Sequence, residues 1–234
     1  MFGLFRKKRR RTCDGAVALR PRDCHTHVVP EVDDGSRSME ESLQMLRMLQ
    51  KQGAKRIIAT PHIYPGRFDN EPDPLRRSFD RLLAEVDKHP EITVELELGA
   101  EHWLGPGLLP RIEAGKLLPF GPERYVLFET TTGSETPEAL MDVCFALSDR
   151  GFTPLLAHVE RYRYLRGESG LDLLEDLRSA GARFQVNRTP AAKRATPRAD
   201  FVKQLQEREW VDEVGSDMHR PTASGRPEAP RRAA

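Results

Sequence analysis

Two histidines end the stretch Asp23-Cys24-His25-Thr26-His27. The stretch reads as a short β-strand, in which side chains at positions i and i+2 point to the same face. His25 and His27 can therefore bind one metal ion, while Thr26 points away from it. A strand that ends in two potential ligands predicts a site at the edge of a sheet.

Outward from this stretch, short apolar runs alternate with segments of helical period. That order is typical of a parallel sheet with crossover helices. We predict strands near 23–27, 56–60, 93–99, 125–130, 154–158, 183–187 and 211–215, and helices at 38–52, 74–88, 137–150, 171–180 and 197–208. Seven such strands fit either an open sheet or a barrel, and periodicity alone does not decide between them.

Imidazole and carboxylate side chains recur where the predicted strands end. They are His25 and His27 on the first strand, His62 after the second, Glu101 after the third, Glu129 on the fourth, His158 on the fifth, and Asp217 and His219 after the last. The carboxyl ends of parallel strands meet where the loops of an α/β barrel form its active site. Six of the seven predicted strands end in this way, which favours a barrel with a metal site at its mouth.

The turn Asp33-Asp34-Gly35 adds carboxylates that can reach back over this mouth. Asp34 is the better candidate for a ligand, because Asp33 can instead cap the turn. Imidazole and carboxylate without thiolate suit Mn, Fe, Co or Zn. The candidate ligands are too many for one ion of four to six coordination, so they predict a cluster of two or three metals.

Neighbouring divalent metals can generate hydroxide near neutral pH and hold phosphate oxygens. Arg161, three residues after His158, can offer a planar guanidinium to the same phosphate. This combination indicates phosphomonoester hydrolysis. Amide hydrolysis stays open as an alternative, although it gives the guanidinium of Arg161 no phosphate to bind.

The composition of the 234 residues limits the other classes of function. Net charge is +1, and an unbroken basic run at 6–11 accounts for six positive charges, so the remainder carries −5. An acidic body argues against a nucleic-acid binder. The basic run is expected to be a solvated tail, with weak contact to an anionic membrane surface as the alternative.

The three cysteines have no paired spacing, and no apolar stretch approaches the roughly 20 residues that span a bilayer. These features predict a cytoplasmic protein. Cys144 and Arg150 have the C-x5-R spacing of cysteine-based phosphatases, but the segment between them lacks glycine and has helical period. We therefore expect Cys144 to be a core residue.

Several motifs together resemble one bacterial family. They are Asp23-Cys24-His25-Thr26-His27, Asp33-Asp34-Gly35, Thr60-Pro61-His62, Gly99-Ala100-Glu101, Ala157-His158-Val159-Glu160-Arg161-Tyr162, Gln185-Val186-Asn187 and Ser216-Asp217-Met218-His219. The chain resembles, from about Arg22 to Arg220, the manganese-dependent protein-tyrosine phosphatases of the PHP (polymerase and histidinol phosphatase) superfamily. The type is CpsB, from capsule and exopolysaccharide operons.

The resemblance implies a distorted seven-stranded parallel (β/α)7 PHP barrel, similar to a TIM barrel, with three Mn²⁺ ions. It implies one ion held by His25, His27, Glu101 and Asp217, a second by Glu101, Glu129 and His158, and a third by Asp34, His62 and His219. Arg161 matches the phosphate-binding arginine of the family. The implied substrate is phosphotyrosine in the tail of a bacterial tyrosine autokinase that controls polysaccharide export.

The domain boundaries follow from the same match: a basic tail at 1–21, the phosphatase domain at 22–220 and a Pro/Arg/Ala-rich tail at 221–234. The chain departs from the family after Glu129, where Thr130-Thr131-Thr132-Gly133 replaces a more apolar stretch. It also departs after the Ser-Asp-x-His motif, where a further helix is expected.

Three alternatives stay open at this stage. One is a small-molecule phosphatase of the same superfamily, similar to histidinol phosphatase. Another is a regulator with little catalytic activity that binds a phosphorylated kinase tail. The least favoured is nucleic-acid processing by a PHP domain.

Overall fold

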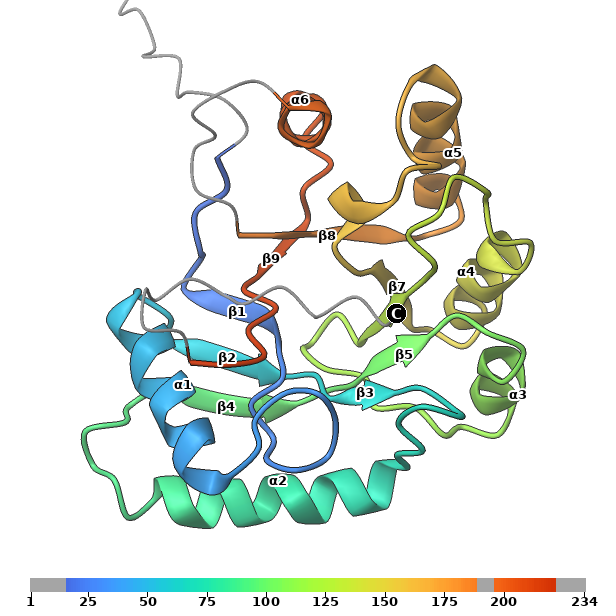
Figure 1. Ribbon diagram of the computed structural model, residues 1–234. Coiled ribbons are helices and arrows are strands. Elements are labelled where there is room, and N and C mark those ends of the chain that lie inside the picture. Colours follow the sequence, from blue (N-terminus) through green and yellow to red (C-terminus); the bar gives the residue numbers. More distant parts are fainter. Residues whose placement is uncertain (1–15, 189–195, 222–234) are drawn as a thin grey trace, which may run out of the picture.

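The computed structural model describes residues 16–188 and 196–221. The basic run at 6–11 and most of the predicted C-terminal tail lie outside these residues. Strands and helices alternate through the described chain, and the strands curl around a common centre with helices on their outer side (Figure 1). Among the helices described, none combines the length and apolar character needed to cross a membrane.

The described residues form nine strands, and each pair of neighbouring strands is parallel. One sheet has the order β1-β2-β4, from β1 (Arg22–Thr26), β2 (Arg56–Ala59) and β4 (Glu95–Leu98). The other has the order β3-β5-β6-β7-β8-β9, from β3 (His62–Ile63), β5 (Glu101–Trp103), β6 (Tyr125–Glu129), β7 (Thr153–Leu156), β8 (Arg183–Asn187) and β9 (Glu213–Gly215).

The predicted count of seven strands is not confirmed, because two of the predicted strands are each followed by a further short strand: β3 comes after 56–60 and β5 after 93–99. Thr60 and Pro61 separate β2 from β3, and Gly99 and Ala100 separate β4 from β5. Proline has no backbone N–H to donate to a neighbouring strand, which ends the pairing of β2 at this point. The two short strands after the breaks begin with His62 and Glu101, which are register partners.

Backbone hydrogen bonds also join the two ends of the strand order. The N–H of His27 donates to the carbonyl of Met218 over 3.0 Å, and the N–H of Asp217 donates to that of His25 over 2.8 Å. Thr26 and Met218 form a parallel bridge. The first and last strands therefore lie side by side, and the residues that follow β9 reach the end of β1.

Seven helical segments connect the strands. They are α1 (Met39–Lys51), α2 (Pro72–Val86), α3 (Leu108–Glu113), α4 (Leu140–Ser148), the 3-10 turn η1 (Val159–Arg161), α5 (Glu168–Ser179) and α6 (Pro197–Glu207). The five predicted helices are confirmed with shifted ends, whereas α3 and η1 were not predicted. Ser38 caps α1 by accepting a hydrogen bond from the N–H of Glu41, as the capping-box spacing indicated.

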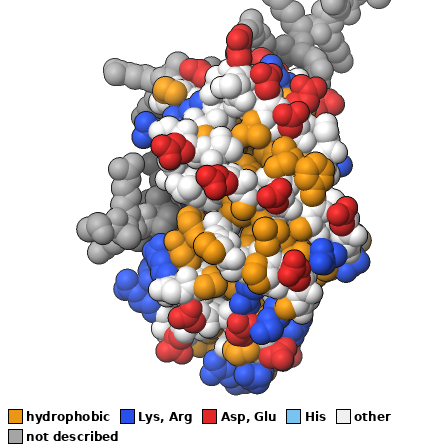
Figure 2. All heavy atoms as spheres, turned by 90° about the vertical axis from the view of Figure 1, so that its right-hand side faces the viewer, with side chains coloured by type: hydrophobic (Ala, Val, Ile, Leu, Met, Phe, Trp, Pro, Cys, Tyr) orange, Lys and Arg blue, Asp and Glu red, His pale blue; other side chains and the backbone are white. Residues whose placement is uncertain are grey.

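The apolar core has an inner and an outer part. The largest cluster packs α3–α6 against strands of the longer sheet, and a second packs α1 and α2 against β2. A small inner cluster takes Cys24 and Ile58 from one sheet and Leu127 and Leu155 from the other, so it lies between the sheets. Apolar side chains also show on the face that carries α3, α4 and α5 (Figure 2), where Phe145 is 51% exposed.

His102 lies on the outward side of β5 and is fully buried, as expected for a structural histidine. Neither ring nitrogen has a hydrogen-bond partner among the described residues. Burial, aided by Arg111, lowers the pKa of His102 to about 3. The folded chain therefore holds this ring neutral at pH values where an unfolded chain protonates it.

We predict that His102 makes the fold sensitive to acid. An unfolded histidine has a pKa of about 6.5, so the unfolded state binds more protons between that pH and about 3, and stability falls as pH drops through this window. At pH 5 the expected loss from this one group is about 2 kcal/mol relative to pH 7.5. Urea unfolding in chelator at both pH values should show a smaller loss for His102→Leu than for the wild type. Equal losses would contradict the prediction.

Candidate metal centre

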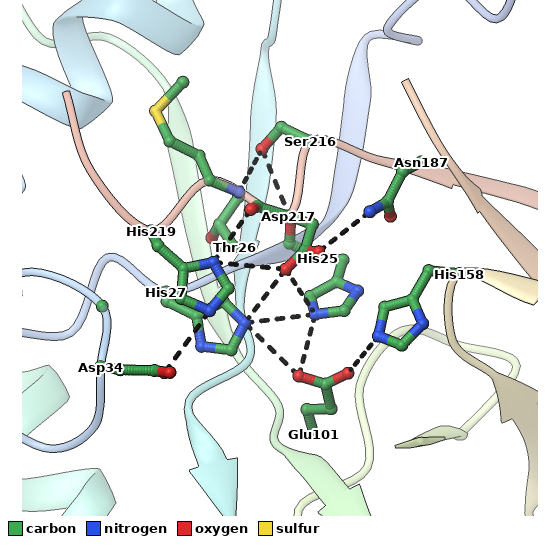
Figure 3. A network of polar contacts seen from close by, with 12 residues as sticks. His25, Thr26, His27, Asp34, Glu101, His158, Asn187, Ser216, Asp217 and His219 are labelled. Carbon is green, nitrogen blue, oxygen red and sulfur yellow. Dashed lines mark hydrogen bonds and ion pairs between the residues drawn. The ribbon is translucent and has the colours of Figure 1, made fainter. Parts of the chain in front are cut away.

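The nine predicted ligands and Arg161 gather at one end of the strands. Figure 3 shows part of this cluster, with His25, Glu101 and Asp217 pointing toward one another. The predicted residues come from the ends of β1, β6 and β7, the starts of β3 and β5, the turn after β1 and the chain after β9. The curled order of the strands brings together residues that are up to 194 positions apart, His25 and His219. No predicted site residue lies elsewhere.

One group forms around His25 and His27. Their Nε2 atoms lie 3.3 Å apart, and the Nε2 of His25 lies 3.1 Å from Oε2 of Glu101 and 3.4 Å from Oδ1 of Asp217. The Nε2 of His27 is 3.4 Å from each of the same two oxygens. The hydroxyl of Thr26 instead donates to the carbonyl of Ile58. The prediction that His25 and His27 share one face while Thr26 points away is therefore confirmed.

A second group shares Glu101. The Nε2 of His158 lies 3.0 Å from Oε1 of Glu101 and 3.6 Å from Oε2 of Glu129. The Nδ1 of His62 reaches both carboxylates as well, at 3.2 Å from Glu101 and 3.5 Å from Glu129. Oε2 of Glu101 therefore faces His25, His27 and His62, and Oε1 faces His158, so this carboxylate can bridge the two groups.

A third group lies on the side of the β1 turn. Oδ1 of Asp34 is 3.5 Å from Nε2 of His62 and 3.4 Å from Nε2 of His219. The rings of His27 and His219 stack with centroids 3.9 Å apart. Together with His27, these residues offer four donor atoms within a radius suitable for one ion.

Two of the candidate ligands have unusual backbone conformations. His158 has φ +30° and Asp217 has φ +52°, in the left-handed region that residues other than glycine seldom adopt. His158 immediately precedes η1, which carries Arg161. Such conformations cost free energy and tend to occur at functional sites, so they are consistent with side chains turned toward a ligand.

Two glycines allow the backbone to approach the histidines. A Cβ atom on Gly35 would lie 2.4 Å from the Cβ of His27, and one on Gly215 would lie 2.4 Å from the Cβ of His25. Real Cβ atoms do not approach one another this closely. Both histidines are therefore placed by packing against glycine backbone as well as by their own strand.

A supporting layer of polar residues orients the candidate ligands. Oδ2 of Asp33 lies 2.8 Å from Nδ1 of His27 and accepts a hydrogen bond from the N–H of His62, while Oδ1 accepts from the N–H of Gly35. Asp33 thus caps the turn, as the sequence suggested, and also fixes the His27 ring. A carboxylate on the far nitrogen of a ligand histidine is a common second-layer feature of metal sites.

Gln185 and Asn187 on β8 extend this layer, and the sequence had shown them only as part of a motif. Oε1 of Gln185 accepts from the N–H of His158 over 2.7 Å and lies 3.1 Å from Nδ1 of His25. Its Nε2 donates to Oδ1 of Asn187, whose Nδ2 donates to Asp217. The predicted strand 183–187, which does not end in an ionisable residue, therefore contributes amide side chains to the site. The alternation of Gln185 and Asn187 was the sequence feature that could have indicated this role.

The cluster is strongly acidic for a buried site. It holds the carboxylates of Asp33, Asp34, Glu101, Glu129 and Asp217, and the guanidiniums that pair with them are those of Arg161 and, at the exposed edge, Arg67. Burial and the neighbouring Glu101 and Asp217 raise the pKa of Glu129 well above its usual value. Burial by itself would raise the pKa of Glu101. Its interactions with His25 and His62 outweigh burial and hold the pKa well below the usual value.

The neutral histidines have free lone pairs for a cation. Burial lowers the pKa of His62 to about 4 and also lowers the pKa of His158, so both rings are neutral at pH 7. Buried atoms that lack a hydrogen-bond partner among the described residues and face this cluster are Asp34 Oδ1, His62 Nδ1 and His219 Nε2. Excess negative charge and unpaired donor atoms both fit divalent metal ions.

Arg161 pairs with Oδ2 of Asp217, and its side chain is 19% exposed at the rim of the cluster. Two tyrosines, Tyr162 and Tyr164, hold the loop around it to the end of β6. The hydroxyl of Tyr162 accepts from the N–H of Thr130 over 3.1 Å, and that of Tyr164 lies 2.7 Å from the Thr130 hydroxyl. The threonine stretch that departs from the family pattern therefore supports the Arg161 loop.

Cys144 lies inside α4 and is fully buried, as predicted for a core residue. Burial raises the pKa of its thiol to about 12. A nucleophilic cysteine requires a lowered pKa, so the C-x5-R spacing to Arg150 does not form a cysteine-phosphatase site.

The family described as "Capsular polysaccharide synthesis, CpsB/CapC" matches residues 22–231, and the chain belongs to this family. The resemblance inferred from the motifs is thereby confirmed, although the match continues past its expected end at Arg220. The tyrosine-protein phosphatase CpsB of Streptococcus agalactiae is 27% identical over 206 residues, covering 84% of this chain and 82% of the relative. YwqE of Bacillus subtilis, also a tyrosine-protein phosphatase, is 29% identical over 204 residues, covering 84% and 76%.

A solved structure from work on YwqE of Bacillus subtilis and CpsB of Streptococcus pneumoniae, described as "unique metal-dependent tyrosine phosphatases", superimposes with a TM-score of 0.74. It is 28% identical and covers 85% of this chain and 79% of its own. The fold of this chain is therefore the α/β fold of these enzymes.

We predict that Gly215→Ala weakens metal binding without unfolding the chain. The added methyl would overlap the Cβ of His25 and must displace that ring. Titration with Mn²⁺ by calorimetry should show affinity reduced by about tenfold or more, in line with changes to the layer that supports ligands. Gly107→Ala is the matched control, because its new Cβ would meet only Pro65 at an ordinary 3.7 Å. Equal affinities in the two variants would refute the role of Gly215.

Proposed function

We propose that this chain is a metal-dependent protein-tyrosine phosphatase that hydrolyses O-phosphotyrosine. The observation that carries the proposal is the shared use of Glu101 by two groups of imidazole and carboxylate donors, with Arg161 at their rim. Membership of the CpsB/CapC family and the names of the relatives support the choice of substrate.

The proposal includes three metal sites, whose candidate ligands lie near one another. The first would use His25, His27, Glu101 and Asp217, the second Glu101, Glu129 and His158, and the third Asp34, His62 and His219. We propose Mn²⁺ as the native ion, on the basis of the family resemblance and of a donor set that contains oxygen and imidazole but no thiolate. Fe, Co and Zn suit the same donors.

Divalent cations in these sites would activate a water molecule and balance the charge of the phosphoryl group. Arg161 would bind phosphoryl oxygens with its planar guanidinium, at a rim position that is open to solvent. The leaving group is a tyrosine phenol with a pKa of about 10, so its departure demands little help from a general acid. The histidines and carboxylates then serve as ligands and need not transfer protons.

The proposed protein substrate is the phosphotyrosine-bearing tail of a bacterial tyrosine kinase in capsule or exopolysaccharide synthesis. The family's place in capsular polysaccharide synthesis supports this choice. The cysteine usage noted above suggests the cytoplasm as the location.

We predict that the activity depends on metal and prefers phosphotyrosine. Chelation should reduce phosphate release from a phosphotyrosine peptide by at least about a hundredfold, because the activated water and the charge balance are lost together. Mn²⁺ should restore it, with bound metal measured by plasma mass spectrometry. Histidinol phosphate tested in parallel should react more slowly. A metal-loaded protein that hydrolyses only histidinol phosphate would support the small-molecule alternative.

We predict that Arg161→Ala lowers kcat/KM on p-nitrophenyl phosphate by about 10²–10³-fold, because a charged group aimed at the transferring phosphoryl is lost. Arg161→Lys should recover only part of this, since an ammonium cannot form a planar pair of hydrogen bonds. Arg150→Ala removes an exposed arginine on the outer side and serves as control. Unchanged turnover in Arg161→Ala, with normal metal content, would exclude the proposed role.

A further inference from the structure

Two aromatic rings stack beside the metal-binding cluster, and the hydrolysis itself does not require them. The rings of Tyr64 and Trp103 have centroids 4.4 Å apart and planes inclined by only 4°. The sequence placed both next to ligand motifs but had no means of pairing them. Their position relative to the candidate ligands indicates what they can do.

Each ring lies two residues after a candidate ligand. Tyr64 follows His62 at this spacing, and Trp103 follows Glu101. His62 and Glu101 are register partners on the adjacent parallel strands β3 and β5. Side chains two positions apart on a strand share a face, so the ring pair forms the next layer outward from the ligand layer.

This layer lies at the mouth and not in the core. Trp103 is the register partner of Glu129, the most exposed carboxylate of the second metal group. Both Tyr64 and Trp103 are only partly buried. A partly exposed aromatic pair on the strands that carry the rim carboxylate can offer ring surface to a planar group of a substrate.

The surface is held rigidly before any substrate arrives. The N–H of Tyr64 donates to the carbonyl of Phe68 over 3.0 Å, and the N–H of Phe68 donates back over 2.7 Å. The Phe68 ring stacks on His62 with planes inclined by 6°. On the other side, a Cβ on Gly105 would lie 2.9 Å from the indole of Trp103, so the indole packs directly on glycine backbone.

Arg67 gives the same surface a positive edge. Its guanidinium carbon lies 5.8 Å from the centroid of the Tyr64 ring and 5.1 Å from that of Phe68. Its Nη2 lies 3.5 Å from Asp34, and the side chain is 45% exposed. A phosphate ester of a phenol combines the two features that match this surface: a dianion for the metal cluster and a flat ring beside it.

We propose that Tyr64 and Trp103 form an aryl-binding wall that makes the site select aryl over alkyl phosphate monoesters. This inference rests on the proposed phosphatase function and adds to it the residues that determine specificity. A phosphoserine or a sugar phosphate would present the same dianion but no ring to the wall.

The test compares inhibitors that share an anion and differ in the ring. Phenylphosphonate and methylphosphonate resist hydrolysis, and calorimetry of the Mn²⁺-loaded full chain measures the affinity for each. The wild type should prefer phenylphosphonate, and Trp103→Ala and Tyr64→Ala should each reduce that preference by about five- to tenfold, as expected for a lost aromatic contact. Trp103→Phe and Tyr64→Phe should retain most of it, and Phe145→Ala on the outer face should change nothing.

Kinetics provide the second readout. Trp103→Ala should raise KM for a phosphotyrosine peptide more than it lowers kcat, because the lost contact is to the ring and not to the transferring phosphoryl. An unchanged preference for phenylphosphonate in both alanine variants, with normal metal content, would overturn the wall. Should Trp103→Ala disturb metal binding, Trp103→Leu keeps apolar bulk without the flat face and carries the same expectation.

The two proposals fail in different ways. A wild-type protein that binds Mn²⁺ but releases no phosphate from phosphotyrosine peptides would overturn the proposed function. The inhibitor comparison needs no turnover and still tests the wall in that case. Active wild-type enzyme with equal affinity for the two phosphonates would overturn the wall alone.

Discussion

The carboxylate of Glu101 is the contact on which the rest of the site depends. It lies within 3.2 Å of imidazole nitrogens from His25, His62 and His158, which come from three different parts of the chain. Glu101 also starts the short strand β5, so its position is set by pairing with β3 and β6. Any shift of β5 would therefore separate the candidate metal sites from one another.

The cluster concentrates negative charge where water is excluded, and this has an energetic consequence. Without cations, burial and the neighbouring carboxylates of Glu101 and Asp217 raise the pKa of Glu129 and so disfavour its ionised form. Bound divalent ions would remove that penalty, so metal binding and folding stability should be coupled in this protein. The close packing on Gly35, in the turn after β1, and on Gly215, at the end of β9, shows that both strand and turn backbone position the histidines.

The mouth of the site differs from its floor in the kind of residue it uses. The floor consists of ligands fixed by Asp33, Gln185 and Asn187, whereas the rim offers Arg161 on one loop and the Tyr64–Trp103 pair across β3 and β5. The floor suits the phosphoryl group common to many substrates. Discrimination between substrates must then come from the rim.

The sequence by itself determined the set of candidate ligands and the alternation of strands and helices. Histidines and carboxylates at strand ends are visible in sequence because strand period and the parallel order both leave local marks. The breaks at Pro61 and at Gly99-Ala100, which give nine strands in two sheets instead of seven, depend on which backbone groups find partners across the sheet. Only the tertiary structure decided these, along with the contact of Asp33 with His27 and the stacking of Tyr64 on Trp103. Each of these is a contact that no local sequence pattern encodes.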